Sequence, residues 1–212
     1  MNAFLNMMNV FVSTALSGSL LLGNPATASS FIAQSAVLIP QNQIILASGS
    51  LDLANRHPDQ IISEGFQENI LIALGYLGNS IILEPSDVFA FHKNILPEFR
   101  VRKIVTQESG FGAKDGYKAV AGLYGNGVCH LASLMNMVAQ NGGLEVMAEV
   151  NHNFAPIPGI DKKYGTSIYF LPRGGSVSER QNLYIVNNFD FPVELVFSLE
   201  GDLLKLTLIA SY

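Results

Sequence analysis

The strongest constraint on the fold of this chain is a pair of glycines followed at once by a helical pattern. Gly125 and Gly127 precede Cys129, the only cysteine in the sequence. From Leu131 onward, apolar residues recur at positions i, i+3, i+4 and i+7, which is the spacing of one helix face. Asn141-Gly142-Gly143 then stops the pattern. The spacing predicts a helix of roughly twelve residues, with the cysteine in or just before its first turn.

A thiol at the start of a helix is well placed for nucleophilic chemistry. The unpaired N–H groups and the positive end of the helix dipole stabilise a thiolate, which is the nucleophilic form. A catalytic cysteine also needs a base. The alternating stretch 144–150 predicts a strand that delivers His152 at its end. Asp161 is the leading candidate to orient that imidazole, with Asn187 or Asn188 behind it. Transglutaminase-like and papain-like thiol enzymes use this layout.

The same residues also fit a purely structural interpretation. A free cysteine such as Cys129 usually packs as a small hydrophobe. His152 lies between Asn151 and Asn153 and is able to cap a turn, while His130 is able to hydrogen-bond within the first helical turn. A zinc site built from the cysteine and these two histidines lacks a fourth ligand and any C-x-x-C spacing. We therefore expect neither a metal nor a cofactor.

The patterns on either side of this helix predict an α+β fold. Phe66, Ile70 and Leu74 begin an apolar stripe for a packing helix over about 64–77, with Ser63 as its N-cap and Gly78 at its end. Short strands are predicted at 81–83, 88–91, 99–105, 144–150, 166–171, 182–186, 193–199 and 203–209. The last two form a hairpin. The expected architecture is a mainly antiparallel sheet with a central helix after the cysteine.

The N-terminal region differs in composition from the rest of the chain. It carries no Asp, Glu, Lys or Arg before Asp52, and residues 4–22 are mostly apolar. Ala26-Thr27-Ala28 is a small-x-small pattern typical of signal cleavage. Residues 1–28 are interpreted as an export signal, although the n-region has no Lys or Arg. The alternatives are an uncleaved membrane anchor, since the run is near spanning length, or a buried apolar helix.

Charge and composition limit the classes of function that this chain can have. The chain has 12 Lys+Arg against 17 Asp+Glu, which argues against a nucleic-acid binder that needs a basic face. Its hydrophobic fraction of 49% predicts a folded domain. The basic residues of 99–105 are interpreted as a solvated strand face, with an anionic ligand as the alternative. Membrane contact is expected only through the N-terminal segment, if it stays uncleaved.

Six short motifs follow one another in a characteristic order. They are Phe89-Ala90-Phe91, Gly116-Tyr117-Lys118-Ala119, Gly125-Asn126-Gly127-Val128-Cys129-His130, His152-Asn153, Pro158-Gly159-Ile160-Asp161 and Asn187-Asn188-Phe189-Asp190-Phe191-Pro192. Together they resemble the VanW family, which is named for a vancomycin-resistance accessory protein. The resemblance covers about 88–208. It divides the chain into the N-terminal segment 1–28, a linker or short extended segments over 29–60, and a VanW-like domain over 61–212.

This chain also departs from the family pattern. His130 stands where the family has Gln, Asn126 where it has Gly, and Asn153 where it has Ser. The Gly-Pro-Arg that usually follows the Phe-x-Phe strand is not recognisable. The resemblance implies a cell-envelope location outside the cytoplasm, but it implies no reaction. It also points to a group of binding residues, namely Tyr117, Gly127, His130, Asn187 and Asn188.

Two functional hypotheses follow. The first is an envelope domain that binds cell-wall material such as peptidoglycan, or a partner protein, without turnover. The second is an amidase, peptidase or acyl transferase acting on peptide-like wall substrates. In that enzyme Cys129 is the nucleophile, His152 the base, and Asp161 or Asn187 the orienting group, with backbone N–H groups as the oxyanion hole. The surroundings of the cysteine sulfur discriminate between the two.

Overall fold

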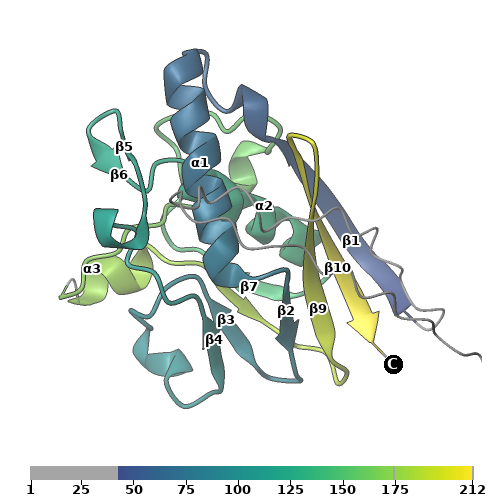
Figure 1. The fold of residues 1–212 in the computed structure, drawn as a ribbon. Helices are drawn as coiled ribbons and strands as arrows, with labels where there is room; N and C mark the ends of the chain where they lie inside the picture. The colour runs from purple at the N-terminus through teal and green to yellow at the C-terminus, as the bar shows by residue number, and fades with distance from the viewer. Residues whose placement is uncertain (1–42, 174, 212) are drawn as a thin grey trace, which may run out of the picture. The chain divides into compact units, whose positions relative to one another are not determined.

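The computed structural model describes residues 43–173 and 175–211. These residues form an α+β fold in which helix α2 (Val128–Asn141) packs against both larger sheets and against helix α1 (Gln60–Leu77) (Figure 1). All but one of the strand pairings are antiparallel. The predicted α+β fold class is therefore confirmed. The predicted export signal lies outside the described residues.

The first sheet is fully antiparallel and has the strand order β1-β10-β9-β2. Its strands are β1 (Gln43–Asp52), β2 (Ser80–Leu83), β9 (Val193–Glu200) and β10 (Leu203–Ser211). The predicted hairpin of β9 and β10 is confirmed. Burial alternates along β9, with Val193, Leu195 and Phe197 buried, as expected for a sheet with one face on the core. Strand β1 pairs with β10, with a register shift between Ile45 and Ala47.

The second sheet has the order β4-β3-β8-β7, and only its β3–β4 pair is parallel. Its strands are β3 (Val88–Ala90), β4 (Ile104–Thr106), β7 (Glu145–Met147) and β8 (Tyr184–Val186). The predicted strand over 99–105 is wrong in its first half, because the 3-10 turn η2 (Pro97–Phe99) and the bend after it occupy that stretch. A small hairpin joins β5 (Ala119–Val120) to β6 (Leu123–Tyr124).

Four other short elements complete the described chain. They are the 3-10 turns η1 (Leu53–Asn55), η3 (Ala113–Asp115) and η4 (Lys162–Tyr164), and the helix α3 (Gly175–Arg180). No helix within the described residues is both long enough and apolar enough to span a bilayer.

Helix α1 begins four residues earlier than the apolar stripe predicted. Asp59 is its N-cap and accepts a hydrogen bond from the Ile62 N–H. The predicted cap, Ser63, is instead buried inside the first turn, where its hydroxyl accepts from the Arg56 N–H and donates to the Ala54 carbonyl. The predicted end at Gly78 is confirmed.

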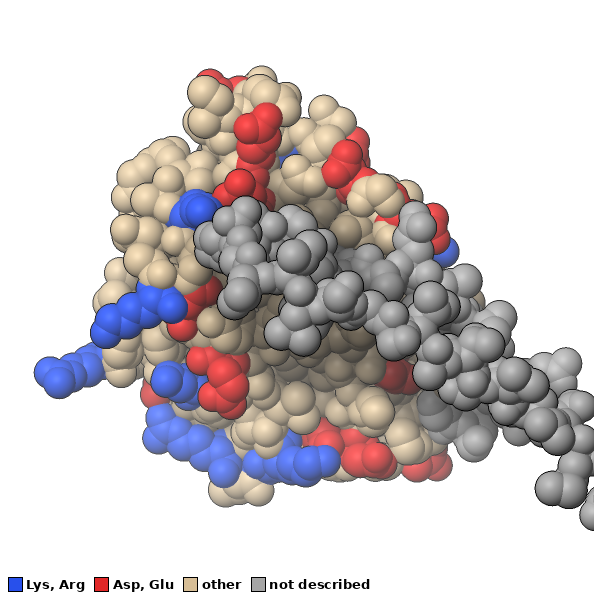
Figure 2. All heavy atoms as spheres, viewed as in Figure 1, with Lys and Arg blue, Asp and Glu red and all other residues tan. Residues whose placement is uncertain are grey.

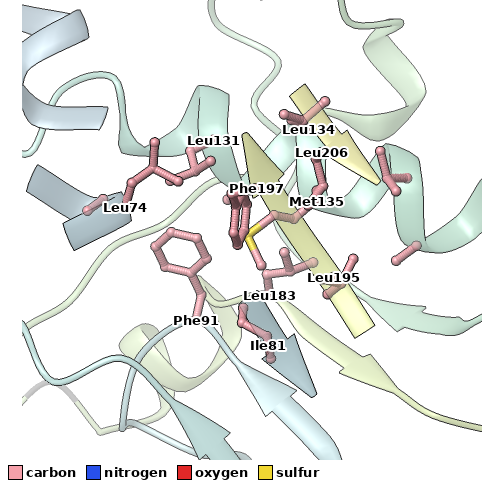
Figure 3. Close-up of a cluster of buried hydrophobic side chains, with 14 of the residues drawn as sticks. Leu74, Ile81, Phe91, Leu131, Leu134, Met135, Leu183, Leu195, Phe197 and Leu206 are labelled. Atoms are coloured by element: carbon pink, nitrogen blue, oxygen red, sulfur yellow. The ribbon is translucent and has the colours of Figure 1, made fainter. Parts of the chain in front are cut away.

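Helix α2 supplies the centre of the core. Leu131, Leu134 and Met135 on this helix are completely buried. Figure 3 shows Met135 pointing from α2 into a group of side chains that includes Phe91 and Phe197. Phe91 directly follows β3 of the second sheet, and Phe197 lies on β9 of the first sheet. The same helix therefore joins the cores of both sheets.

The charged surface is mixed in sign. In Figure 2, Lys and Arg side chains gather at the lower left, below β3 and β4 and near α3, with acidic side chains among them. Two ion pairs belong to this region: Arg100 with Glu179, and Lys103 with Asp87. The basic side chains predicted for 99–105 are thus partly matched by carboxylates.

Candidate functional site

Cys129 lies in the first turn of α2, as the sequence predicts, and its sulfur is held by backbone. The Ile168 N–H donates to Sγ at 3.3 Å, and the thiol donates to the Ile168 carbonyl at 3.8 Å. Burial raises the pKa of the thiol above its ordinary value, and the hydrogen bond from Ile168 opposes that rise. The desolvation effect therefore exceeds the thiolate stabilisation expected at a helix start.

The cysteine belongs to a row of polar side chains along one face of α2. Ser133 accepts from the Thr166 N–H at 2.8 Å. Asn136 donates to the Tyr164 carbonyl and to the Thr166 hydroxyl, both at 3.0 Å. With Cys129 this row holds the segment 164–168 against the helix. The predicted strand over 166–171 is wrong. On one edge its N–H groups bond to side chains of α2, and on the other edge Ser167 and Tyr169 donate separately to the Val150 and Gln181 carbonyls, which does not build a strand ladder.

His152 is buried, but the structure shows no hydrogen bond between it and Cys129. Its Nδ1 lies 3.1 Å from the carbonyl oxygen of Ala155. A carbonyl only accepts, so Nδ1 carries the proton and the neutral ring keeps a lone pair on Nε2. Burial lowers the pKa of His152 below its usual 6.5, so the ring is neutral at neutral pH.

His152 and Asp161 line the same cavity, whereas Cys129 does not. The cavity has a volume of about 200 Å³. Its wall is formed by one stretch of chain around the Pro156-Ile157-Pro158-Gly159 turn: His152, Asn153, Phe154, Ala155, Pro156, Ile157, Ile160, Asp161, Lys162 and Gly165. Asp161 does not orient the imidazole; it caps η4, where its Oδ1 accepts from the Lys163 N–H at 3.0 Å. The structure thus unites two of the three predicted catalytic residues.

A row of aromatic rings connects this cavity to α1. His152 contacts exposed Phe154 in a tilted arrangement with ring centroids 4.0 Å apart, and contacts His130 edge-on at 5.9 Å. His130 in turn meets Phe66 of α1 at 5.3 Å, and that ring lies 6.0 Å from His57. His130 therefore places an imidazole directly behind the cavity wall, at the position compared above with a Gln of the VanW family.

His130 is unusual because its Nδ1 is fully buried without a hydrogen-bond partner among the described residues. Burial, together with the charges of Arg56, His152 and His57, lowers the pKa of this imidazole to about 3. Arg56 is itself buried and donates from Nη1 to the Pro158 carbonyl at 3.0 Å. It thereby ties the end of η1 to the turn that forms the cavity.

The other predicted binding residues have structural partners. Tyr117 is buried against Ser109, and burial raises its pKa. Asn187 donates to the Leu83 and Phe191 carbonyls, and Asn188 accepts from the Glu145 N–H at 3.2 Å. Gly127 begins α2 beside the backbone of α1. None of these four residues lines the cavity.

The sequence interpretation missed part of the site. Phe154, Lys162 and Gly165 line the cavity. Arg56 supports the cavity, although the residues around Arg56 in the sequence predict only a surface turn. The sequence feature that indicates this site is the Pro-Ile-Pro-Gly turn, with His152 before it and Asp161 after it. In the described residues, no group of three or more His, Cys, Asp or Glu side chains is arranged to hold a metal ion.

Comparisons with protein-family models, curated proteins and solved structures gave no significant match to this chain.

Proposed function

We propose that this chain is an envelope domain, similar to the VanW family, that binds cell-wall material or a partner protein without chemical turnover. The observation that carries the proposal is the state of Cys129. Its sulfur is engaged by both backbone groups of Ile168, and burial raises its pKa. A nucleophilic thiol requires the opposite conditions, namely a lowered pKa and a base within hydrogen-bond reach.

The cavity around His152 and Asp161 is the binding site in this proposal. Its volume of about 200 Å³ is below the roughly 300–1,000 Å³ of pockets for drug-sized ligands. It therefore suits a single residue-sized group at the end or side of a larger molecule. A mixed lining of apolar and polar side chains is typical of such sites, and peptide-like wall material presents groups of this size.

Labelling of the thiol tests the absence of a catalytic nucleophile. With the full-length chain at neutral pH, iodoacetamide should modify Cys129 more slowly than in a urea-unfolded control, because the folded thiol is protonated and hydrogen-bonded. Faster labelling of the folded chain would revive the thiol-dependent amidase, peptidase or acyl transferase.

Binding is tested by co-sedimentation of the full-length chain with purified peptidoglycan sacculi. Ala155→Trp places a large side chain at the cavity, where Ala155 is exposed, and should reduce the bound fraction. Val101→Trp is the matched control, because Val101 is 90% exposed and does not line the cavity. If the parent chain stays in the supernatant, the cell-wall ligand is excluded. Equal loss in both variants would count against the cavity.

A further inference from the structure

Two side chains of the cavity wall, His152 and Asp161, each offer a hydrogen-bond acceptor. Nδ1 of His152 is committed as a donor to the Ala155 carbonyl, so the neutral ring offers only an acceptor at Nε2. That nitrogen has no hydrogen-bond partner among the described residues. Asp161 uses Oδ1 to cap η4, and its other carboxylate oxygen has no partner in the described part of the chain.

The charges near the cavity disfavour a ligand that carries a full positive charge. Lys162 lines the wall together with Asp161. Arg56 lies behind it, bonded to the Pro158 carbonyl; burial lowers the pKa of Arg56 and the Asp52 carboxylate opposes that shift, but the two side chains form no direct ion pair. A ligand cation would meet both positive groups, whereas a neutral donor meets the acceptors without that repulsion.

The remaining wall is apolar. Phe154 is 80% exposed, and its ring contacts His152 in a tilted arrangement. Ile157 and Ile160 also line the cavity. An occupant therefore needs an apolar body about the size of one amino-acid residue as well as its donor group.

We propose that the cavity binds a neutral peptide residue through its amide N–H, with Nε2 of His152 and the carboxylate of Asp161 as the acceptors. The inference rests on the proposed function, because it assigns a ligand class to the same cavity. Phe154 and the isoleucines contact the apolar part of the residue. No bond is made or broken.

This assignment makes binding depend on pH. Protonation of His152 turns Nε2 from an acceptor into a donor and adds a charge to a site already facing Lys162, Arg56 and the His130 ring. Among the described residues that line the wall, Asp161 is the only negative one. The affinity for an amide donor should therefore fall as the pH is lowered through the pKa of His152, which burial places below 6.5.

Two matched small probes test the ligand class on the full-length, ¹⁵N-labelled chain. Both probes carry the N–H of the acetyl amide; N-acetylalanine amide adds a neutral terminal amide donor, whereas N-acetylalanine ends in a carboxylate, which at pH 7 only accepts. At pH 7 the amide should shift the backbone resonances of Asn153, Ala155 and Gly165 and bind more tightly than the acid. Its affinity should weaken about three- to tenfold in His152→Asn, the range of one hydrogen bond. That variant keeps a donor near the Nδ1 position but has no group at Nε2.

Asp161→Asn is the second variant, since its amide oxygen still accepts from the Lys163 N–H while the charge is lost. It too should bind the amide more weakly. Tighter binding of N-acetylalanine than of its amide, or amide binding that strengthens at low pH, would overturn the ligand class while leaving the cavity as the site. If neither probe shifts the cavity resonances, both the ligand class and the proposed site are wrong.

Discussion

At the scale of single residues, the imidazole behind the cavity makes the stability of the fold depend on pH. His130 is buried and its Nδ1 has no hydrogen-bond partner in the described part of the chain, so the protonated form is strongly disfavoured in the fold. Its pKa is lowered to about 3 from an ordinary 6.5. Between these values the unfolded chain binds a proton that the folded chain does not, so stability is lost as the pH falls below 6.5.

The slope of that loss can be measured. Each such histidine lowers the free energy of unfolding by about 1.4 kcal/mol per pH unit between roughly pH 6 and pH 4. His92, whose pKa is lowered to about 4 by burial, adds to the slope in the upper part of this window. In urea titrations at pH 6, 5 and 4, His130→Gln should reduce the slope by about 1.4 kcal/mol per unit. The parent and the variant contain the same carboxylates, so the contribution of these groups to the pH slope cancels when one slope is subtracted from the other. Equal slopes would mean that His130 is protonated in the fold.

The sulfur of Cys129 gives a second prediction at this scale. Cys129→Ala leaves the Ile168 N–H without its acceptor, so the free energy of unfolding should fall by about 1–3 kcal/mol. Sedimentation with sacculi should be unchanged at a temperature where the variant is folded, because the thiol is outside the cavity. Loss of binding in a folded variant would return the cysteine to the functional site. Cys129→Ser, which keeps a hydroxyl acceptor, should recover part of the stability.

At the scale of elements, the contact between the two long helices depends on a single glycine. Gly127 has φ +101°, and a Cβ built there would lie 2.6 Å from the Phe66 carbonyl oxygen and 2.9 Å from Phe66 Cα. These are backbone atoms of α1, which do not move aside as a side chain does. Gly127 therefore serves both the backbone conformation and the close approach of the helices, although the family resemblance suggested a binding role.

Gly127→Ala should lower the free energy of unfolding by about 2–5 kcal/mol, the sum of backbone strain and overpacking. Gly122→Ala is the control: Gly122 has φ +82° but nothing within 4 Å of a built Cβ. Its expected loss is only about 1–2 kcal/mol, from strain alone. The difference in guanidinium unfolding midpoints isolates the steric contact. Equal losses would show that the helices are not in close contact there.

The elements also show which parts of the fold a sequence reveals. Helix α2 and the β9–β10 hairpin were predictable because their apolar periods and turn residues are local. The pairing of β1 with β10 was not, because the partner strand lies at the other end of the chain. The stretch 166–171 has strand-like residues, but its partner is the polar row on α2, which becomes visible only once the helix is placed.

The same distinction applies to the candidate site. His152 and Asp161 were found because both flank one short turn, so their proximity needs little long-range information. The proposed link to Cys129 needed the relative position of α2 and the following loop. That position places Ile168, rather than His152, in hydrogen-bond contact with the sulfur.

At the scale of the whole molecule, α2 contacts both larger sheets and shares one core with them. The core cluster around this helix contains residues from both sheets, including Phe89 from the second and Leu195 and Leu206 from the first. A cavity at its centre should therefore weaken both sheets together rather than release one of them.

Met135→Ala tests this cooperativity. Met135 is fully buried in the cluster of Figure 3, so truncation should lower the free energy of unfolding by about 2–5 kcal/mol. Native-state hydrogen exchange should show the same loss of protection for the slowest amides of β3 and β8 as for those of β9 and β10. Ile82→Ala is the surface control, since Ile82 on β2 is 55% exposed. A loss confined to one sheet would mean that the sheets unfold separately and that α2 belongs to only one of them.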